Sequence, residues 1–127
     1  VKIDRAAGSA GYAWSKLGMT FVTLSLDGEL AGHDIGCNSV WPVTAVDTRA
    51  TRYFGLGTEK DWRTPEVVSD AFLEVLNRDP AECSGNSFYD EELLRDAGVE
   101  DFSGYNVVED GDPGPMSARP FDPDYQQ

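Results

Sequence analysis

The run of residues 12–30 constrains the fold more than any other part of this chain, because its pattern predicts one long helix. Apolar residues lie near one face of this helix and are also spread around it. The first set is Ala13, Leu17, Phe21 and Leu24, and the second is Trp14, Met19, Val22 and Leu26. So wide an apolar surface predicts burial on two sides, by a sheet and by a second element or subunit.

A strand is expected directly after this helix. Gly32 is a typical helix terminator, residues 35–41 are short and β-leaning, and Pro42 stops the run. A long helix, a tight turn and a strand make half of a βαβ unit, whose first strand would precede Val1. The region therefore predicts an α/β fold.

The following segments continue the same alternation. Thr64, Pro65 and Glu66 form a strong helix start for residues 65–77, with Val68, Ala71, Phe72, Val75 and Leu76 on one face. Residues 84–89 predict a turn and a short strand, and Asp90 is expected to cap a brief helix over residues 91–97. A turn and a short helix are expected between residues 42 and 53.

The net negative charge of the chain argues against a nucleic acid as its partner. The 127 residues include 23 acidic and 10 basic side chains, a net charge of −13, which would repel a nucleic acid. A docking surface for a basic partner would gather its acids in blocks, whereas these are spread from Asp4 to Asp124. Dispersed acidity is typical of proteins kept soluble at high salt, so a halophilic archaeal source is expected. No signal peptide or membrane-spanning run is visible, so we expect a cytoplasmic protein without membrane contact.

Metal chemistry is not expected. Cys37 and Cys83 stand 46 positions apart and match no metal or redox spacing. A single histidine, His33, cannot make a metal site by itself. Cys37 lies in the apolar strand pattern, where a buried thiol is the ordinary interpretation.

Tyr12 and Lys16 are the candidates for chemistry. Four positions on a helix place both side chains on one face, about one turn apart. A phenol has a pKa near ~10, and an ammonium about 4 Å away stabilises the phenolate by roughly 4 kcal/mol, or about three pK units, at a surface-like dielectric. Such a pair can transfer a proton to or from an alcohol or carbonyl oxygen. The alternative is a surface tyrosine beside a solvated lysine, and short motifs of this kind arise by chance.

Several blocks, taken in order, resemble the C-terminal half of a short-chain dehydrogenase/reductase. They are Tyr12-x-x-x-Lys16, the strand ending in Asn38-Ser39-Val40-Trp41-Pro42 with Thr44 and Thr48, Arg63-Thr64-Pro65-Glu66, and Gly85-Asn86-Ser87-Phe88 followed by Asp90-Glu91-Glu92-Leu93-Leu94-Arg95. Within that family the chain is most similar to the hydroxysteroid dehydrogenase-like subgroup. The resemblance runs from about Gly11 to Tyr105. It implies that residues 1–105 are the C-terminal half of a single domain, and leaves residues 106–127 as an acidic, proline-rich tail.

The resemblance implies the C-terminal portion of a Rossmann-type, doubly wound parallel sheet, without its dinucleotide-binding half. It implies hydride transfer between NAD or NADP and a small alcohol or carbonyl substrate. Tyr12 would be the acid/base, Lys16 would assist it and bind the nicotinamide ribose, and Pro42, Val46 and Thr48 would hold the carboxamide and a phosphate. Strand termination and core packing are the alternative roles of Pro42 and Val46. A homodimer or homotetramer through the 12–30 helix is also implied.

The chain departs from the family in two ways. Val43 stands where glycine is usual, and Thr48 comes one residue late. The glycine-rich loop and the catalytic serine of the family would lie before Val1, so these residues alone are expected to be inactive. Two other interpretations stay open: a non-catalytic acidic module that dimerises through the long helix, and an epimerase or dehydratase that uses the same Tyr/Lys pair.

Overall fold

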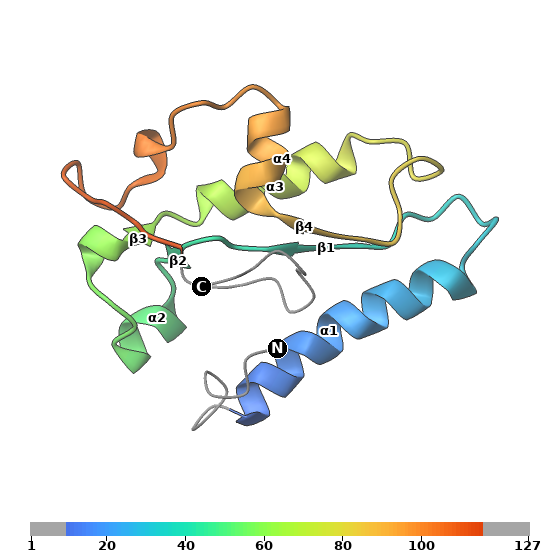
Figure 1. Ribbon diagram of the computed structural model, residues 1–127, viewed down its shortest axis with the longest axis horizontal. Coiled ribbons are helices and arrows are strands. Elements are labelled where there is room, and N and C mark those ends of the chain that lie inside the picture. The colour runs from blue at the N-terminus through green and yellow to red at the C-terminus, as the bar shows by residue number, and fades with distance from the viewer. Residues whose placement is uncertain (1–9, 116–127) are drawn as a thin grey trace. The chain divides into compact units, whose positions relative to one another are not determined.

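The computed structural model describes residues 10–115, which form two compact units (Figure 1). Residues 10–39 and 78–87 make the first unit, and residues 40–77 and 88–115 make the second. Most of the predicted acidic tail therefore lies outside the described residues. Within residues 10–115, no helix combines the length and apolar character that a membrane crossing requires.

The long helix of the first unit is α1 (Ala10–Glu29), close to the bounds predicted for it. Its more buried positions lie mostly at helical spacing and are Ala13, Lys16, Leu17, Gly18, Thr20, Thr23 and Asp27. Thr20 is the one fully buried residue of this helix, and Phe21 points about 100° away from it. The predicted burial on two sides is thus not found among the described residues. Several large apolar side chains stay exposed, including Trp14, Met19, Phe21 and Val22.

A polar link fastens the C-terminal end of α1. The Ser84 hydroxyl donates to Asp27 Oδ1 at 2.5 Å and accepts from the Cys37 N–H at 2.9 Å. The next residue, Gly85, has φ +71°, and a Cβ built there would lie 2.6 Å from Asp27 Oδ2. Glycine is therefore required at position 85 both for its backbone conformation and for space.

The strand predicted over residues 35–41 is shorter than expected. β1 covers Asn38–Trp41 and pairs with β4 (Asn86–Tyr89). Regular pairing begins late because Asp34 has φ +54° and because the Cys37 N–H bonds to the Ser84 side chain in place of a backbone carbonyl. The Asn38 side chain then bridges the two segments, donating to the Cys83 carbonyl and accepting from the Asn86 N–H.

The second unit contains a second strand pair that the sequence did not predict. β2 (Ala45–Val46) pairs in parallel with β3 (Trp62–Arg63), with Ala45 opposite Trp62 and Val46 opposite Arg63. Two residues are too few to give a period-2 signal, which explains why neither strand was recognised. The short helix expected between residues 42 and 53 is α2 (Arg49–Phe54).

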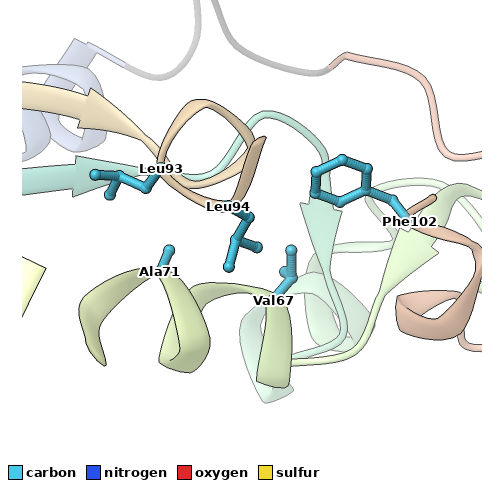
Figure 2. Packing of buried hydrophobic residues seen from close by; sticks show 5 residues of the cluster. All are labelled: Val67, Ala71, Leu93, Leu94 and Phe102. Atoms are coloured by element: carbon cyan, nitrogen blue, oxygen red, sulfur yellow. The ribbon is translucent and has the colours of Figure 1, made fainter. Parts of the chain in front are cut away.

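Two helices enclose the core of the second unit. They are α3 (Glu66–Leu76) and α4 (Asp90–Asp96), and single 3-10 turns form at Glu59–Asp61 and Ser103–Tyr105. Figure 2 shows side chains from α3 and α4 facing one another, with the Phe102 ring at one side of them; the buried cluster is Val67, Ala71, Leu93, Leu94 and Phe102. The face predicted for α3 is correct at Ala71, which is buried, and at Val68 and Val75, which are half-buried against the core cluster. It is wrong at Phe72 and Leu76, which are exposed. Val67 lies four residues before Ala71 and faces the core in their place.

Candidate functional site

Tyr12 and Lys16 lie on the first two turns of α1 and share one face. The Lys16 ammonium is 5.6 Å from the centroid of the Tyr12 ring, which is within cation–π range. The Tyr12 side chain is open to solvent, with the residue 67% exposed. In water, two unit charges 4 Å apart interact by only about 1 kcal/mol, against about 4 kcal/mol at a partly protected surface. The Lys16 charge can therefore stabilise negative charge on the Tyr12 oxygen strongly only when this face of α1 is covered.

The other three predicted site residues, Pro42, Val46 and Thr48, belong to the second unit. Pro42 follows β1, Val46 ends β2, and Thr48 is the N-cap of α2. The alternative of a packing role for Val46 has support, because Val46 is half-buried against the core cluster. The Val46 carbonyl also accepts a hydrogen bond from the Thr51 hydroxyl.

Thr48 and Thr51 form a hydrogen-bond relay whose direction is fixed. The Thr51 hydroxyl donates its single proton to the Val46 carbonyl at 2.6 Å. In the 2.8 Å contact between the two hydroxyls, Thr48 must therefore be the donor. Thr48 Oγ1 also accepts the Thr51 N–H at 3.2 Å. The Thr48 hydroxyl thus has one lone pair left for a ligand and no proton to give.

Helix α2 presents exposed aromatic side chains next to an ion-paired arginine. Arg52 bonds both carboxylate oxygens of Asp47 at 2.6 and 2.7 Å and reaches Glu59 at 3.2 Å. This hydrogen bonding holds the pKa of Asp47 below its ordinary value. The adjacent Tyr53 and Phe54 rings meet edge to face at 5.0 Å and are 81% and 69% exposed. They are not core residues, whereas Trp62, the other aromatic residue nearby, is buried.

A buried ionic cluster connects β3 with α4. Arg63 is only 8% exposed and pairs with Glu91, which also binds Arg95 at 3.2 Å. Both guanidinium groups lie over the Phe102 ring, at 4.8 and 4.6 Å from its centroid. Because an isolated buried charge is very costly, this shared carboxylate is what permits Arg63 to be inside. In the sequence, Arg63 was recognised only as part of the Arg63-Thr64-Pro65-Glu66 block, and its burial was not predicted.

Asp90 is the residue whose role sequence reasoning missed most clearly. It was expected to cap α4, but the N-cap is Tyr89, and Asp90 is the first helical residue. Its side chain is 1% exposed, and Oδ1 accepts the Val43 N–H at 2.9 Å as well as the Glu91 N–H at 2.8 Å. A strand followed by Asp gives the same local signal for a cap and for a long-range tether, so the sequence could not separate them.

The fold is that of a short-chain dehydrogenase over the part that matches. A crystal structure of a dehydrogenase from Xanthomonas campestris superposes with a TM-score of 0.78 at 34% identity, and covers 84% of this chain and 39% of that one. A short-chain dehydrogenase from Mycobacterium thermoresistibile gives a TM-score of 0.69 at 35% identity, over 87% of this chain and 40% of that one. The chain therefore has the α/β architecture of a portion of a Rossmann-type domain.

Among curated proteins, the chain is similar to hydroxysteroid dehydrogenase-like protein 2. It is 37% identical to the Xenopus tropicalis protein over 97 residues, or 76% of this chain, and 31% identical to the Homo sapiens protein over 115 residues, or 90% of this chain. The chain spans about a quarter of the length of these relatives, 23% and 25% respectively. No family model matches it. The subgroup predicted from the motif blocks is thus the one to which these relatives belong.

Proposed function

We propose that this chain supplies the acid/base part of an NAD(P)-dependent oxidoreductase that acts on an alcohol or carbonyl. The observation that carries the proposal is the placement of Tyr12 and Lys16 on one face of α1, in a chain whose fold matches dehydrogenases at 34% and 35% identity. When bound, the nicotinamide ring would supply or accept the hydride. The protein's own task is then to move one proton and to position the reacting groups.

The proton step falls to Tyr12. In the direction of reduction, the phenol gives its proton to the carbonyl oxygen as negative charge develops there, and in oxidation the phenolate takes the proton from the alcohol. Lys16 favours the phenolate by its charge. Because Tyr12 is largely exposed, this pair would work poorly until its face of α1 is covered. The proposal therefore includes that the 127 residues alone are inactive.

The residues after β1 have chemistry that fits a nicotinamide cofactor. The free lone pair of Thr48 would accept an amide N–H, such as that of the carboxamide, and the Thr48 hydroxyl would not donate to a phosphate while its proton is held by the Thr51 hydroxyl. Lys16 would bind the ribose hydroxyls as a donor. The exposed Tyr53 and Phe54 on α2 suit an apolar substrate.

A second function stays a candidate because of the exposed apolar residues on α1. Trp14, Met19 and Phe21 are 77%, 61% and 68% exposed, which suits a helix that joins subunits. In the complete protein we propose a homodimer or homotetramer through this helix. If the Tyr/Lys pair were inert, the same helix would make the chain a non-catalytic interaction module.

One experiment separates the enzyme from the module. A chimera is made in which this chain replaces the matching 39% of the Xanthomonas campestris dehydrogenase. Its oxidation of NADH and NADPH is then followed with a panel of apolar aldehydes and ketones. We expect turnover by the chimera and none by the 127 residues alone. Tyr12→Phe should lower kcat by about 100-fold or more, the ordinary contribution of a general acid.

The matched control is Lys60→Met, which removes a charge from an exposed pair with Asp110. It should leave kcat within about twofold, since an exposed ion pair contributes little, whereas Lys16→Met should lower it strongly. A folded chimera that binds NADH but turns over equally well after the Tyr12→Phe substitution would sink the proposed chemistry. Activity of the 127 residues alone would refute the proposed dependence on a covering half.

A further inference from the structure

The Asp90 carboxyl is a buried titratable group that the proposed chemistry does not use. It lies at the junction of β4 and α4, and Oδ1 accepts two backbone N–H groups, one local and one 47 residues away. The distant donor is Val43, the residue that stands where glycine was expected. A buried acceptor with two such donors is a specific structural device.

The position of this bond explains how the chain leaves the sheet. β1 ends at Trp41 and β4 ends at Tyr89, and Pro42 has no N–H to donate. At the next donor, Val43, the acceptor is the Asp90 side chain, so the β1–β4 ladder stops there. The chain is then free to turn into β2, where Ala45 and Val46 pair with β3. Asp90 thus sets the point from which residues 43–48 depart.

The far end of this segment is also held. Val46 accepts from Thr51, and Thr48 caps α2. Between the two ends, Thr44 is 2% exposed and forms a bridge with Pro115. Residues 43–48 are therefore tied at both ends and in the middle, which is the rigidity that a positioned ligand requires.

Charged groups around Asp90 act in opposite directions. Burial raises the pKa of its carboxyl and the neighbouring Glu91 raises it further, while the two backbone donors and Arg63 lower it. Among residues 10–115, Oδ2 has no hydrogen-bond partner. The contact with Val43 uses Oδ1, so it can persist whether or not Oδ2 carries a proton.

We propose that Asp90 is a positioning residue for the cofactor, which acts through the Val43 N–H to hold residues 43–48 in the conformation that binds the nicotinamide end. The inference rests on the proposed NAD(P)-dependent function. It adds a residue on α4 that touches no ligand and yet governs affinity for one. A side chain that keeps the acceptor should preserve this effect, and one of similar size without an acceptor should not.

The first test uses the full 127-residue chain without cofactor. Amide hydrogen exchange of residues 43–48 is compared in the parent, Asp90→Asn, Asp90→Val and Leu93→Ala. Asn retains an oxygen acceptor, Val does not, and Leu93→Ala weakens the same core without touching Val43. We expect exchange of this segment to accelerate about tenfold in Asp90→Val, through loss of a buried hydrogen bond, and to stay near the parent rate in Asp90→Asn. Equal exchange in the Asn and Val variants would overturn the inference, whatever the function.

The second test uses the chimera described above. Asp90→Val should raise the KM for NADH or NADPH about tenfold while the KM for the carbonyl changes little, and Asp90→Asn should restore it to within about twofold. Leu93→Ala should lower thermal stability and leave the cofactor KM unchanged at temperatures where the protein is folded. A chimera that binds cofactor with the same KM in all variants would refute the role of Asp90 alone. A chimera that binds no cofactor would refute the proposed function and this inference with it.

Discussion

At the scale of single residues, the informative side chains are those whose hydrogen bonds span long stretches of sequence. Asp90 and Ser84 each accept a backbone N–H from 47 residues away, that of Val43 and that of Cys37. Asp90 does so while buried, and burial raises the pKa of its carboxyl above its ordinary value of 3.8. The native state therefore binds this proton more tightly than the unfolded chain does.

This difference predicts a pH dependence of stability. A carboxyl with a raised folded pKa contributes most below its unfolded pKa, and its contribution is lost as the pH rises through the folded value. Asp90→Asn cannot ionise, so the free energy of unfolding of the parent relative to this variant should fall as the pH rises above the ordinary value of 3.8. Urea titrations of both proteins between pH 4 and 7 would show it. A parallel pair of curves would contradict a raised pKa for Asp90.

Other carboxyl groups with shifted pKa values do not affect the comparison between the parent and Asp90→Asn. Asp47, Asp61 and Asp101 all have lowered pKa values because of hydrogen bonds to Arg52, Thr58 and Ser103. Their contribution runs in the opposite sense and is lost as the pH falls. Since both proteins share these groups, they cancel in the comparison.

At the scale of elements, the sequence predicted the helices well and the strands less well. α1, α3 and α4 have bounds within about two residues of the prediction, because helical periodicity is a local signal. The caps predicted for α3 and α4 were each wrong by one residue: the N-caps are Pro65 and Tyr89 in place of Thr64 and Asp90. The strand over residues 35–41 was too long by three residues, because Ser84 captures the Cys37 N–H from a distant part of the chain. Strands β2 and β3 exist through their pairing with each other, which no local pattern records.

Two glycines should respond in opposite ways to the same methyl group. Gly85→Ala places a Cβ 2.6 Å from Asp27 Oδ2 at a residue with φ +71°, so it should lower the free energy of unfolding by roughly 1–3 kcal/mol. Gly18→Ala lies within α1 with nothing within 4 Å of the new Cβ, so it should raise stability by up to about 1 kcal/mol. Thermal denaturation of the two variants beside the parent would test this. A Gly85→Ala variant as stable as the parent would show that Asp27 does not constrain position 85, and a Gly18→Ala variant less stable than the parent would contradict the open space at position 18.

For the candidate site, the sequence supplied the residue pair but not its surroundings. Tyr12 and Lys16 could be predicted to share a face from their spacing alone. The relay that fixes the proton of Thr48 could not, because it depends on the Val46 carbonyl lying beside Thr51. The role of Asp90 was hidden for the same reason, since its partner Val43 is 47 residues away.

At the scale of the whole molecule, the dominant quantity is a net charge of −13 on 127 residues. Repulsion among exposed acids disfavours a compact chain, and salt weakens it by shortening the Debye length from about 10 Å at 0.1 M to about 3 Å at 1 M. Salt would also weaken exposed ion pairs such as Lys60 with Asp110, but such pairs contribute little to stability. The balance favours stabilisation by salt.

We therefore expect the melting temperature of the full chain to rise when sodium chloride is increased from about 0.1 to about 2 M. Sodium chloride is the suitable salt because sulfate would also strengthen apolar burial. A melting temperature that fell or stayed constant would remove the physical basis for proposing a high-salt environment. The same series at pH 4, where many of the acids are neutral, should show a smaller rise.

The link between Asp27 and Ser84 has a mechanical consequence for Tyr12, which lies fifteen residues away along the same helix. A helix rises about 1.5 Å per residue, so α1 acts as a lever arm of about 22 Å, and a tilt of about 3° at its fastened end swings the phenol by about 1 Å. The Ser84 hydroxyl, together with the buried Thr20 in the middle of the helix, therefore fixes the direction in which α1 extends toward the phenol.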